Sequence, residues 1–299
     1  MKVFYHSDND GKCAGFWVKE LATPDEKYDT EFIKMDYNID FPFETIKPNE
    51  TVYIVDYSIS TEEMDKLFNI TTNIIWIDHH KSAIERYENY DKEIKGLRYD
   101  GIAGCMLTYC YLKHMTDRGN GEVKSFSSEM TEDAPEFTKL IADYDVWTFK
   151  YGDKTRAFEK GFTLFLHEPE DEIWDDLLTE SDLFNNTTLT LSNIISSGKT
   201  IIEYRKNMMR DYCEKKGFEA VLDGNKCFAV NMAMMGTDDF IIPNVEDYDI
   251  LISFSFDGMN WNYSLRSTKI DCAELAMKYG GGGHKGAAGF SQKEFILEV

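Results

Sequence analysis

Aspartate and histidine residues gather in four short motifs in the first half of the chain. They are His6-Ser7-Asp8-Asn9-Asp10-Gly11, Asp56 after the run Tyr53-Ile54-Val55, Asp78-His79-His80, and the pair Asp143 and Asp145 in LIADYDVW. Carboxylates a few ångströms apart repel one another, so one of them takes up a proton unless a cation lies nearby. Mixed imidazole and carboxylate ligands suit manganese, iron or zinc better than calcium. The set exceeds the needs of one ion, which predicts two divalent metal ions sharing an aspartate, an arrangement used for phosphoester hydrolysis.

Each motif alone also has a purely structural explanation. The H-x-D-x-D-G pattern is typical of a solvent-exposed turn with Gly11 at positive φ, and Asp56 alone is typical of a helix cap or a turn. Adjacent histidines after an apolar strand are rare as core residues, so the combination favours a site. His114 and His167 stand apart from these motifs, and we expect them to be structural or on the surface.

A second group of residues near the end of the chain could bind an anion. It comprises Tyr263-Ser264-Leu265-Arg266-Ser267 and Gly280-Gly281-Gly282-Gly283-His284-Lys285. Consecutive glycines leave backbone amides free to face a phosphate, while Arg266, His284 and Lys285 add positive charge and hydrogen-bond donors. A flexible linker is the alternative, but Ala287-Ala288 and a further apolar stretch follow directly and favour a structured element.

The elements that must position the first group alternate between strand and helix patterns. Apolar runs predict strands at 2–5, 51–55 and 73–77, and helices are predicted at 12–21, 61–68 (with Thr61 as a cap), 102–115 and 136–143. Such alternation predicts an α/β fold with a parallel sheet and helices packed on it. Because ligands bind at the carboxyl ends of such strands, the four motifs should meet at one sheet edge.

The second half of the chain has a different pattern. A polar stretch at 181–193 precedes a predicted long helix at about 190–216. Strands are expected at 218–222, 226–233, 248–256 and 260–267, with turns at Asp223-Gly224 and Asp257-Gly258 and a helix at 271–279. A chain of 299 residues exceeds what one core usually holds. We therefore predict a catalytic domain at 1–185, a linker helix at 186–216, and a smaller α/β substrate-binding domain at 217–299.

Composition narrows the classes of partner. The net charge is −22, which disfavours a grip on long nucleic acids because neutralisation of the phosphate backbone dominates their affinity. No apolar run approaches the roughly 18 residues of a membrane span, and MKVFYHSDND does not read as a signal peptide, so we expect a cytoplasmic protein without a membrane partner. The six cysteines match no zinc pattern and are expected to be reduced, partly buried thiols.

At these motifs the chain resembles the DHH superfamily of phosphoesterases. HSDNDG, VDYS, DHH and ADYD occur in the order and at the spacing of that family. SLRS with GGGGHKGAAGF resembles the DHH-associated domain of its nano-RNase and oligoribonuclease-like branch. The resemblance covers nearly the whole chain and implies an α/β catalytic domain, a smaller substrate-binding domain, and an active cleft between them.

The resemblance also implies roles for individual residues. One metal ion would take His6, Asp8 and Asp56, and the other would take Asp10, Asp56, His79 and Asp143, with Asp56 bridging. His80 would contact the scissile phosphate or assist the leaving group, and Asp78 would orient a histidine. Whether Asp143 or Asp145 is the ligand stays open. The substrate phosphate would be held by Arg266, Ser267, Gly281, Gly282, Gly283 and His284.

The implied activity is a manganese-dependent, exonuclease-like hydrolysis of phosphodiester or terminal phosphate bonds. The expected partners are short oligonucleotides or small nucleotides such as 3′-phosphoadenosine 5′-phosphate, and a homodimer is left open. A cyclic-dinucleotide phosphodiesterase is one alternative; a non-catalytic nucleotide sensor and a structural metal protein are alternatives of other classes. Candidates for stacking on a base are Tyr57, Tyr144, Trp147 and Trp261.

Overall fold

The computed structural model describes residues 1–21, 29–117, 125–179, 190–233 and 235–299. The chain forms two compact units, Met1–Lys199 and Thr200–Val299. The boundary lies within α9 (Leu191–Lys216), which corresponds to the long helix expected at 190–216. Most of the polar stretch at 181–193 lies outside the described residues, and the functions assigned to the two domains stay predictions.

The first unit is built on a four-stranded sheet in the order β2-β1-β3-β4. Its strands are β1 (Lys2–His6), β2 (Glu31–Met35), β3 (Val52–Val55) and β4 (Ile74–Ile77). All three neighbouring pairs are parallel. The three predicted strands are therefore confirmed. β2 had no clear sequence signal, since its residues alternate weakly and only Met35 is buried.

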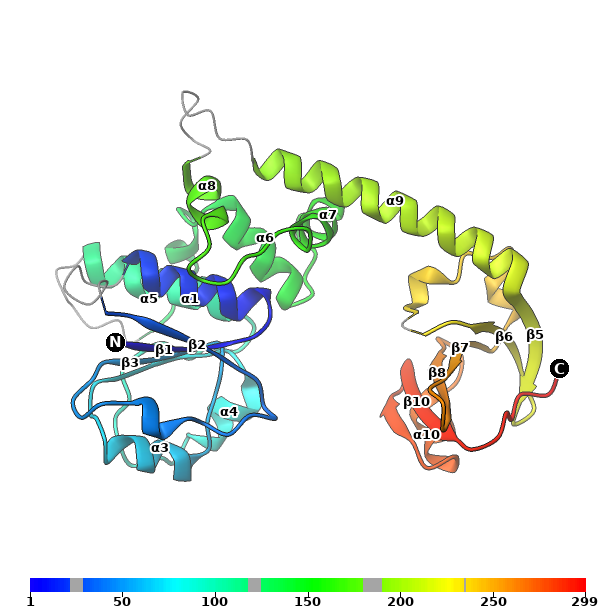
Figure 1. The fold of residues 1–299 in the computed structure, drawn as a ribbon, viewed down its shortest axis with the longest axis horizontal. Helices are drawn as coiled ribbons and strands as arrows, with labels where there is room; N and C mark the ends of the chain where they lie inside the picture. Colours follow the sequence, from blue (N-terminus) through cyan, green and yellow to red (C-terminus); the bar gives the residue numbers. More distant parts are fainter. Residues whose placement is uncertain (22–28, 118–124, 180–189, 234) are drawn as a thin grey trace. The chain divides into compact units, whose positions relative to one another are not determined.

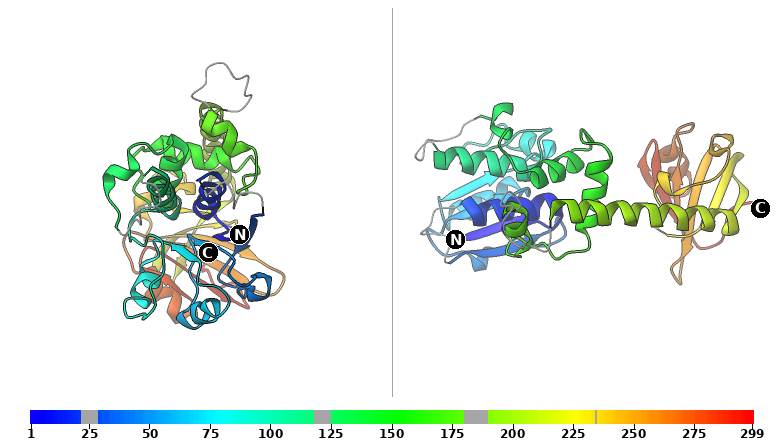
Figure 2. Two further views of the ribbon diagram at one scale, coloured as in Figure 1. Left: turned by 90° about the vertical axis from the view of Figure 1, so that its left-hand side faces the viewer. Right: turned by 90° about the horizontal axis from the view of Figure 1, so that it is seen from above.

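Helices cover both faces of this sheet (Figures 1 and 2). On one face lie α1 (Asn9–Leu21) and α5 (Gly104–Asp117); on the other lie α3 (Thr61–Phe68) and α4 (Lys81–Arg86). Phe4, Ile54 and Trp76 of the sheet pack in one core with side chains of α3 and α4. The remaining elements are η1 (Phe43–Thr45), η2 (Ser128–Thr131), α6 (Glu136–Asp145), α7 (Asp153–Phe162) and α8 (Ile173–Thr179). The predicted α/β class is confirmed.

One helix start differs from its prediction by a residue. Ser60, not Thr61, caps α3: its hydroxyl accepts from the Glu63 amide at 3.2 Å, and the Glu63 carboxylate accepts from the Ser60 amide at 2.8 Å. This reciprocal pair satisfies two backbone donors that an uncapped helix leaves open. Thr61 is instead the first helical residue.

The second unit holds a six-stranded mixed sheet in the order β5-β6-β7-β8-β10-β9. The strands are β5 (Gly217–Leu222), β6 (Asn225–Asn231), β7 (Ile250–Phe256), β8 (Trp261–Arg266), β9 (Gly282–His284) and β10 (Ala287–Gln292). β6 and β7 are parallel, and the segment of the chain that connects them contains η3 (Thr237–Asp239) and η4 (Val245–Asp247). α10 (Cys272–Lys278) packs into one core with the sheet, and Met209 and Cys213 of α9 pack into another. The turn at Asp223-Gly224, with positive φ at both residues, is the predicted hairpin.

Two expectations from composition can be compared with these units. All six cysteines are free and buried, in agreement with reduced thiols. Within the described ranges, every helix is too short or too polar to cross a lipid bilayer.

Candidate active site

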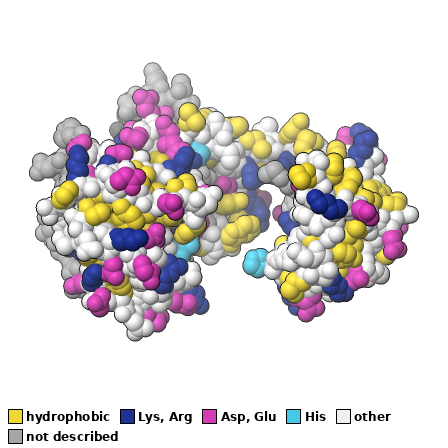
Figure 3. Space-filling model, turned by 60° about the horizontal axis from the view of Figure 1, so that its bottom comes forward, with side chains coloured by type: hydrophobic (Ala, Val, Ile, Leu, Met, Phe, Trp, Pro, Cys, Tyr) yellow, Lys and Arg dark blue, Asp and Glu magenta, His cyan; other side chains and the backbone are white. Residues whose placement is uncertain are grey.

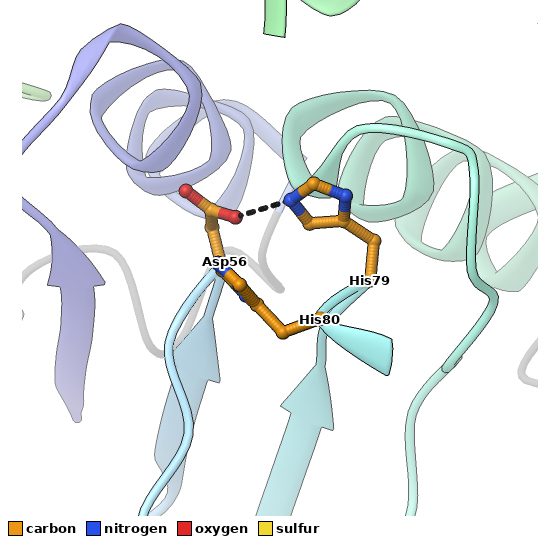
Figure 4. Close-up of side chains that lie close together, drawn as sticks. All are labelled: Asp56, His79 and His80. Carbon is orange, nitrogen blue, oxygen red and sulfur yellow. Dashed lines mark ion pairs between the residues drawn. The ribbon is translucent and has the colours of Figure 1, made fainter. Parts of the chain in front are cut away.

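Three predicted motifs meet at one edge of the four-stranded sheet. β1, β3 and β4 run parallel, so the residues that follow them emerge at the same edge. Figure 4 shows Asp56 and His79, from neighbouring strand ends, turned toward one another. The Asp56 carboxylate oxygen Oδ1 lies 3.1 Å from His79 Nε2. The topology thus brings together side chains separated by about twenty residues in sequence.

The ligand atoms form one continuous cluster. Three sets have their donor atoms within 4.8 Å of one another: His6, Asp8 and Asp56; Asp56, His79 and His80; and Asp10, His79 and Asp145. Asp56 belongs to two of these sets, and His79 also belongs to two. The first set is one that the resemblance implied, and the shared position of Asp56 is the geometry that a bridging aspartate needs.

The two acids in the last turn of α6, Asp143 and Asp145, have different surroundings. Asp145 Oδ2 lies 3.4 Å from His79 Nε2, within the cluster. The Asp143 carboxylate instead accepts hydrogen bonds from the Thr148 hydroxyl at 2.5 Å and the Lys150 amide at 2.7 Å, and from the Thr155 hydroxyl. Burial raises the pKa of Asp143, but these hydrogen bonds outweigh it and hold the pKa below its usual range. Asp143 is therefore fully engaged away from the cluster.

The cluster carries more negative charge than its surroundings can stabilise. Asp56 is 1% exposed, and burial together with repulsion from neighbouring carboxylates raises its pKa to about 7, despite the nearby His6 ring, whose Nδ1 lies 3.7 Å from Asp56 Oδ2. Burial and then repulsion from Asp10 raise the pKa of Asp145 to about 7. Burial and the charge of Asp56 raise the pKa of Asp10 well above its usual range. The neighbouring carboxylates of Asp56 and Asp8 raise the pKa of His6 to about 10.

Several buried carboxylate oxygens have no hydrogen-bond partner among the described residues. They are both oxygens of Asp56, Oδ2 of Asp78 and Oδ2 of Asp145. Such unpaired acceptors are rare in native proteins, because each costs its full desolvation penalty. Divalent cations would satisfy these oxygens and remove the repulsion, so the residues present fit a metal centre.

The Asp78-His79-His80 turn is fixed by the first of its three residues. Asp78 Oδ1 accepts from the His79 amide at 2.8 Å, from the His80 amide at 3.2 Å, and pairs with His80 Nδ1 at 2.7 Å. This last contact is the largest cause that raises the pKa of His80 to about 9. Asp78 thereby sets the orientation of the His80 ring, the kind of role that the resemblance implied for it.

Backbone features that the sequence analysis missed also shape the cluster. Asp10 accepts from the Gly104 amide at 2.6 Å and the Cys105 amide at 2.9 Å, at the start of α5. A Cβ atom on Gly104 would lie 2.6 Å from the Asp56 Cβ. Asp56 itself has a φ of 52°, in the left-handed region that is strained for such a residue. The only feature of the sequence that pointed to Gly104 was its position near the start of a predicted helix.

Gly11 has a different role from the one its motif suggested. It lies within α1 rather than in a turn of positive φ. A Cβ atom at this position would lie 2.2 Å from the His6 carbonyl oxygen. Glycine is therefore needed so that α1 can start directly against the end of β1, which places Asp8 and Asp10 beside His6.

The sequence analysis did not single out one aromatic residue whose ring lies near the cluster. The Tyr37 ring, 56% exposed, lies 5.7 Å from the His6 ring and 6.1 Å from the His80 ring, and stacks on buried Tyr57 at 5.1 Å. It follows β2, the strand that was not predicted. His167, expected to be structural or on the surface, contacts the side-chain oxygen of Asn9 through Nε2 at 2.7 Å.

The glycine-rich segment of the second unit forms an edge strand, not an open loop. Gly282, Gly283 and His284 make up β9, which pairs with β10 only. Gly283 has a φ of 145°, and its Cβ would lie 2.6 Å from the Ala288 Cα, so only glycine fits there. The Gly281 amide already donates to the Ala276 carbonyl at 2.9 Å. Among the glycine amides expected to be free for an anion, that of Gly281 is therefore already engaged, and the phosphate-binding role of the segment stays a prediction.

The other predicted phosphate contacts differ in availability. The Ser267 hydroxyl donates to the Asp249 carbonyl at 2.7 Å and accepts from two backbone amides, so it has no donor left for a phosphate. Arg266 uses one guanidinium nitrogen on the Leu265 carbonyl at 2.8 Å, and it keeps further donors. His284 is exposed. Of this set, Arg266 and His284 are the side chains best able to meet an anion.

Comparisons with known proteins agree with the motifs. No family model matches the chain. Oligoribonuclease NrnB of Bacillus subtilis is 23% identical in an alignment covering 99% of this chain and 74% of that enzyme. An uncharacterized protein of Acanthamoeba polyphaga mimivirus is 25% identical over 262 residues, 81% of this chain and 53% of the viral protein, so the chain spans about half of that relative.

Solved structures were compared as well. A pGpG-specific phosphodiesterase from Vibrio cholerae aligns over 98% of this chain and 92% of its own, with a TM-score of 0.47 and 14% identity. A DHH domain described as part of a member of the s1p family of ribosomal proteins aligns over 99% and 82%, with a TM-score of 0.47 and 13% identity. The resemblance to the DHH family that the ordered motifs predict is confirmed, whereas no relative named above reaches 30% identity.

Proposed function

We propose that the protein is a metal-dependent phosphoesterase that hydrolyses phosphodiester or terminal phosphate bonds of short oligonucleotides or small nucleotides. The observation that carries the proposal is the set of buried carboxylate oxygens without hydrogen-bond partners at the edge of the first sheet. A cluster this negative is stabilised by cations, and mixed imidazole and carboxylate ligands favour manganese, iron or zinc.

Two divalent cations would be held by the interlocking sets of the cluster. His6, Asp8 and Asp56 would hold one ion, and Asp10, Asp56, His79 and Asp145 the other, with Asp145 in the place that the motif had given to Asp143. When bound, such ions activate water and neutralise charge on a phosphate. Manganese as the native metal, and two as the number of ions, are part of this proposal.

The protein itself would orient the substrate and move a proton. His80, held by Asp78 and partly exposed, has a raised pKa and would donate a proton toward the scissile phosphate or the leaving oxygen. Arg266 and His284 offer free donors for a second phosphate. No covalent bond between enzyme and substrate is needed for this chemistry.

Small substrates fit the charge of the molecule better than long ones. Figure 3 shows Lys and Arg side chains scattered among Asp and Glu on the visible face. With a net charge of −22, such a surface repels a long polyanion. The similarity of this chain to an oligoribonuclease supports short oligonucleotides as the first substrates to test. A homodimer and a cytoplasmic location stay predictions from the sequence.

The test is a hydrolysis assay with a panel of substrates. The metal-free protein would be incubated with and without manganese and with diribonucleotides, cyclic dinucleotides and 3′-phosphoadenosine 5′-phosphate. We expect manganese-dependent turnover of at least one linear substrate. Asp145→Asn should lower it by about 100-fold or more, since it removes a metal ligand, while the exposed carboxylate change Asp91→Asn should leave it unchanged.

Other outcomes distinguish the alternatives. Tight binding of a nucleotide without turnover would identify a sensor. Turnover of cyclic dinucleotides alone would change the substrate class but keep the chemistry. A folded protein that hydrolyses no phosphate ester with manganese, iron or zinc would refute the proposal.

A further inference from the structure

The segment that follows α6 displays an exposed aromatic ring two residues after a member of the acidic cluster. Trp147 is 67% exposed, whereas Trp17, Trp76 and Trp174 are buried and Trp261 is half-buried. Trp147 lies two residues after Asp145, whose carboxylate belongs to the cluster. Consecutive Cα atoms are 3.8 Å apart, so the Trp147 Cα lies within about 7.6 Å of the Asp145 Cα. The backbone position that carries the indole is therefore close to a residue of the cluster.

The backbone that presents this ring is strained at two bulky residues. Trp147 has a φ of 54° and Phe149 a φ of 46°. Large side chains rarely adopt the left-handed region, and such outliers concentrate at functional sites, where the surrounding structure holds them in place. A segment that served only to connect α6 with α7 would not need this conformation.

Asp143 holds the segment in its strained form. Its carboxylate accepts from the Thr148 hydroxyl at 2.5 Å, the Lys150 amide at 2.7 Å and the Tyr151 amide at 3.2 Å, and from the Thr155 hydroxyl in α7. Its carbonyl accepts from the Thr148 amide at 3.2 Å. The bonds anchor the backbone on the far side of Trp147 to the end of α6. They also explain why the ADYD motif contains two acids.

Neighbouring rings support the indole from the protein side. Trp147 lies 5.8 Å from the Tyr144 ring and 5.2 Å, edge to face, from the Phe149 ring. The Arg156 guanidinium lies 4.1 Å from the centroid of the Phe149 ring. These contacts fix the position of the indole while most of its surface stays open.

We propose that Trp147 is a stacking platform for a nucleobase, and that Asp143 is the positioning residue that presents it. This inference rests on the proposed function, since the base would belong to a nucleotide whose phosphate lies at the cluster. Stacking on an aromatic ring tolerates any base, because every base has a π-face. The platform therefore predicts that a base is required next to the scissile phosphate, with little preference among the four bases.

The first test compares substrates with and without that base. For Trp147→Ala, we expect kcat/KM on a diribonucleotide to fall about 10- to 100-fold, mainly through KM, as a lost stacking interaction requires. On the same dinucleotide lacking one base, the variant should match the wild-type protein. Trp147→Phe should retain most of the activity, and Tyr204→Ala, a change at a similarly exposed aromatic residue, should have no effect. An equal loss on both substrates, or no loss on either, would overturn the platform.

The second test measures binding and needs no turnover. Adenosine 5′-monophosphate should quench the fluorescence of the exposed indole saturably, ribose 5-phosphate should not, and the quenching should disappear in Trp147→Phe. Quenching that persists in this variant would refute the inference. If no phosphate ester is hydrolysed but this quenching is lost in Trp147→Phe, the proposed function fails and the base platform stands.

The role of Asp143 has its own readout. Asp143→Asn should weaken the binding of adenosine 5′-monophosphate about 3- to 10-fold, because it weakens the hydrogen bonds that hold the segment. It should leave the increase in Tm caused by manganese unchanged. Loss of that increase in Asp143→Asn, with Asp145→Asn unaffected, would place Asp143 among the metal ligands and overturn this division of roles.

Discussion

The acid-rich edge of the first sheet and the glycine-rich edge strand of the second unit were both predicted to bind parts of one substrate, but they differ physically. At the first, carboxylates are buried, close together and partly without hydrogen-bond partners. At the second, Gly282 and His284 are exposed, and neighbouring amides are already engaged. The first region lowers the stability of the fold unless cations bind there, whereas the second region needs no ligand for its stability. Ligand removal should therefore affect the two regions very differently.

The largest expected effect comes from the shared aspartate. Asp56→Asn keeps the shape of the side chain but removes the charge that two ions would share. We expect metal-dependent hydrolysis to fall by about 1,000-fold or more, as the loss of several kcal/mol of charge stabilisation implies. The metal-free variant should unfold at a higher temperature than the wild-type protein, because a buried, repelled carboxylate has been neutralised. A metal-free variant with a lower Tm would show that Asp56 is not destabilising.

Two glycines test how tightly each region is packed. Gly104→Ala places a Cβ atom 2.6 Å from the Asp56 Cβ, and overpacking of this kind lowers the free energy of unfolding by about 1–3 kcal/mol. Gly282→Ala meets nothing within 4 Å, so it should change stability by less than about 0.5 kcal/mol. Urea denaturation of both variants measures the contrast. Equal effects would mean that the first edge can relax as freely as the second.

The pH dependence of metal stabilisation sharpens the contrast further. In the metal-free protein the pKa of Asp56 and of Asp145 is raised to about 7. These groups therefore favour the metal-free folded state most at acidic pH, and that contribution is lost as the pH rises from the unfolded-state pKa of about 3.9 through 7. Metal binding must displace their protons, so the increase in Tm caused by manganese should grow between pH 6 and pH 8. An increase that is the same at both values would contradict the raised pKa of these groups.

The smallest structural effect is expected in the second unit. His284→Ala removes an exposed side chain, so the free energy of unfolding should change by less than about 0.5 kcal/mol. If His284 contacts a substrate phosphate, KM should still rise by roughly 10-fold, the value of one charged hydrogen bond. Steady-state kinetics on a diribonucleotide would separate these effects. A change in kcat with KM constant would place His284 in the chemical step.

Sequence patterns alone established the fold class and most of the cluster. Apolar runs of four or five residues marked β1, β3 and β4, and acids or histidines directly after them marked the site, because parallel strands end at one edge. The long helix also followed from periodicity. β2 was missed because its residues are only partly buried and carry a weak pattern.

The tertiary structure decided which of several equivalent residues meet. Asp143 and Asp145 are both acids of one helix end, and their spacing cannot tell which carboxylate turns toward His79 and which anchors the following segment. The contacts of Gly104 with Asp56, and of Tyr37 with the rings of His6 and His80, depend on distant segments that only the packed fold brings within reach. Residue type and order are local properties and can be read along the chain, whereas direction and distance are set by packing.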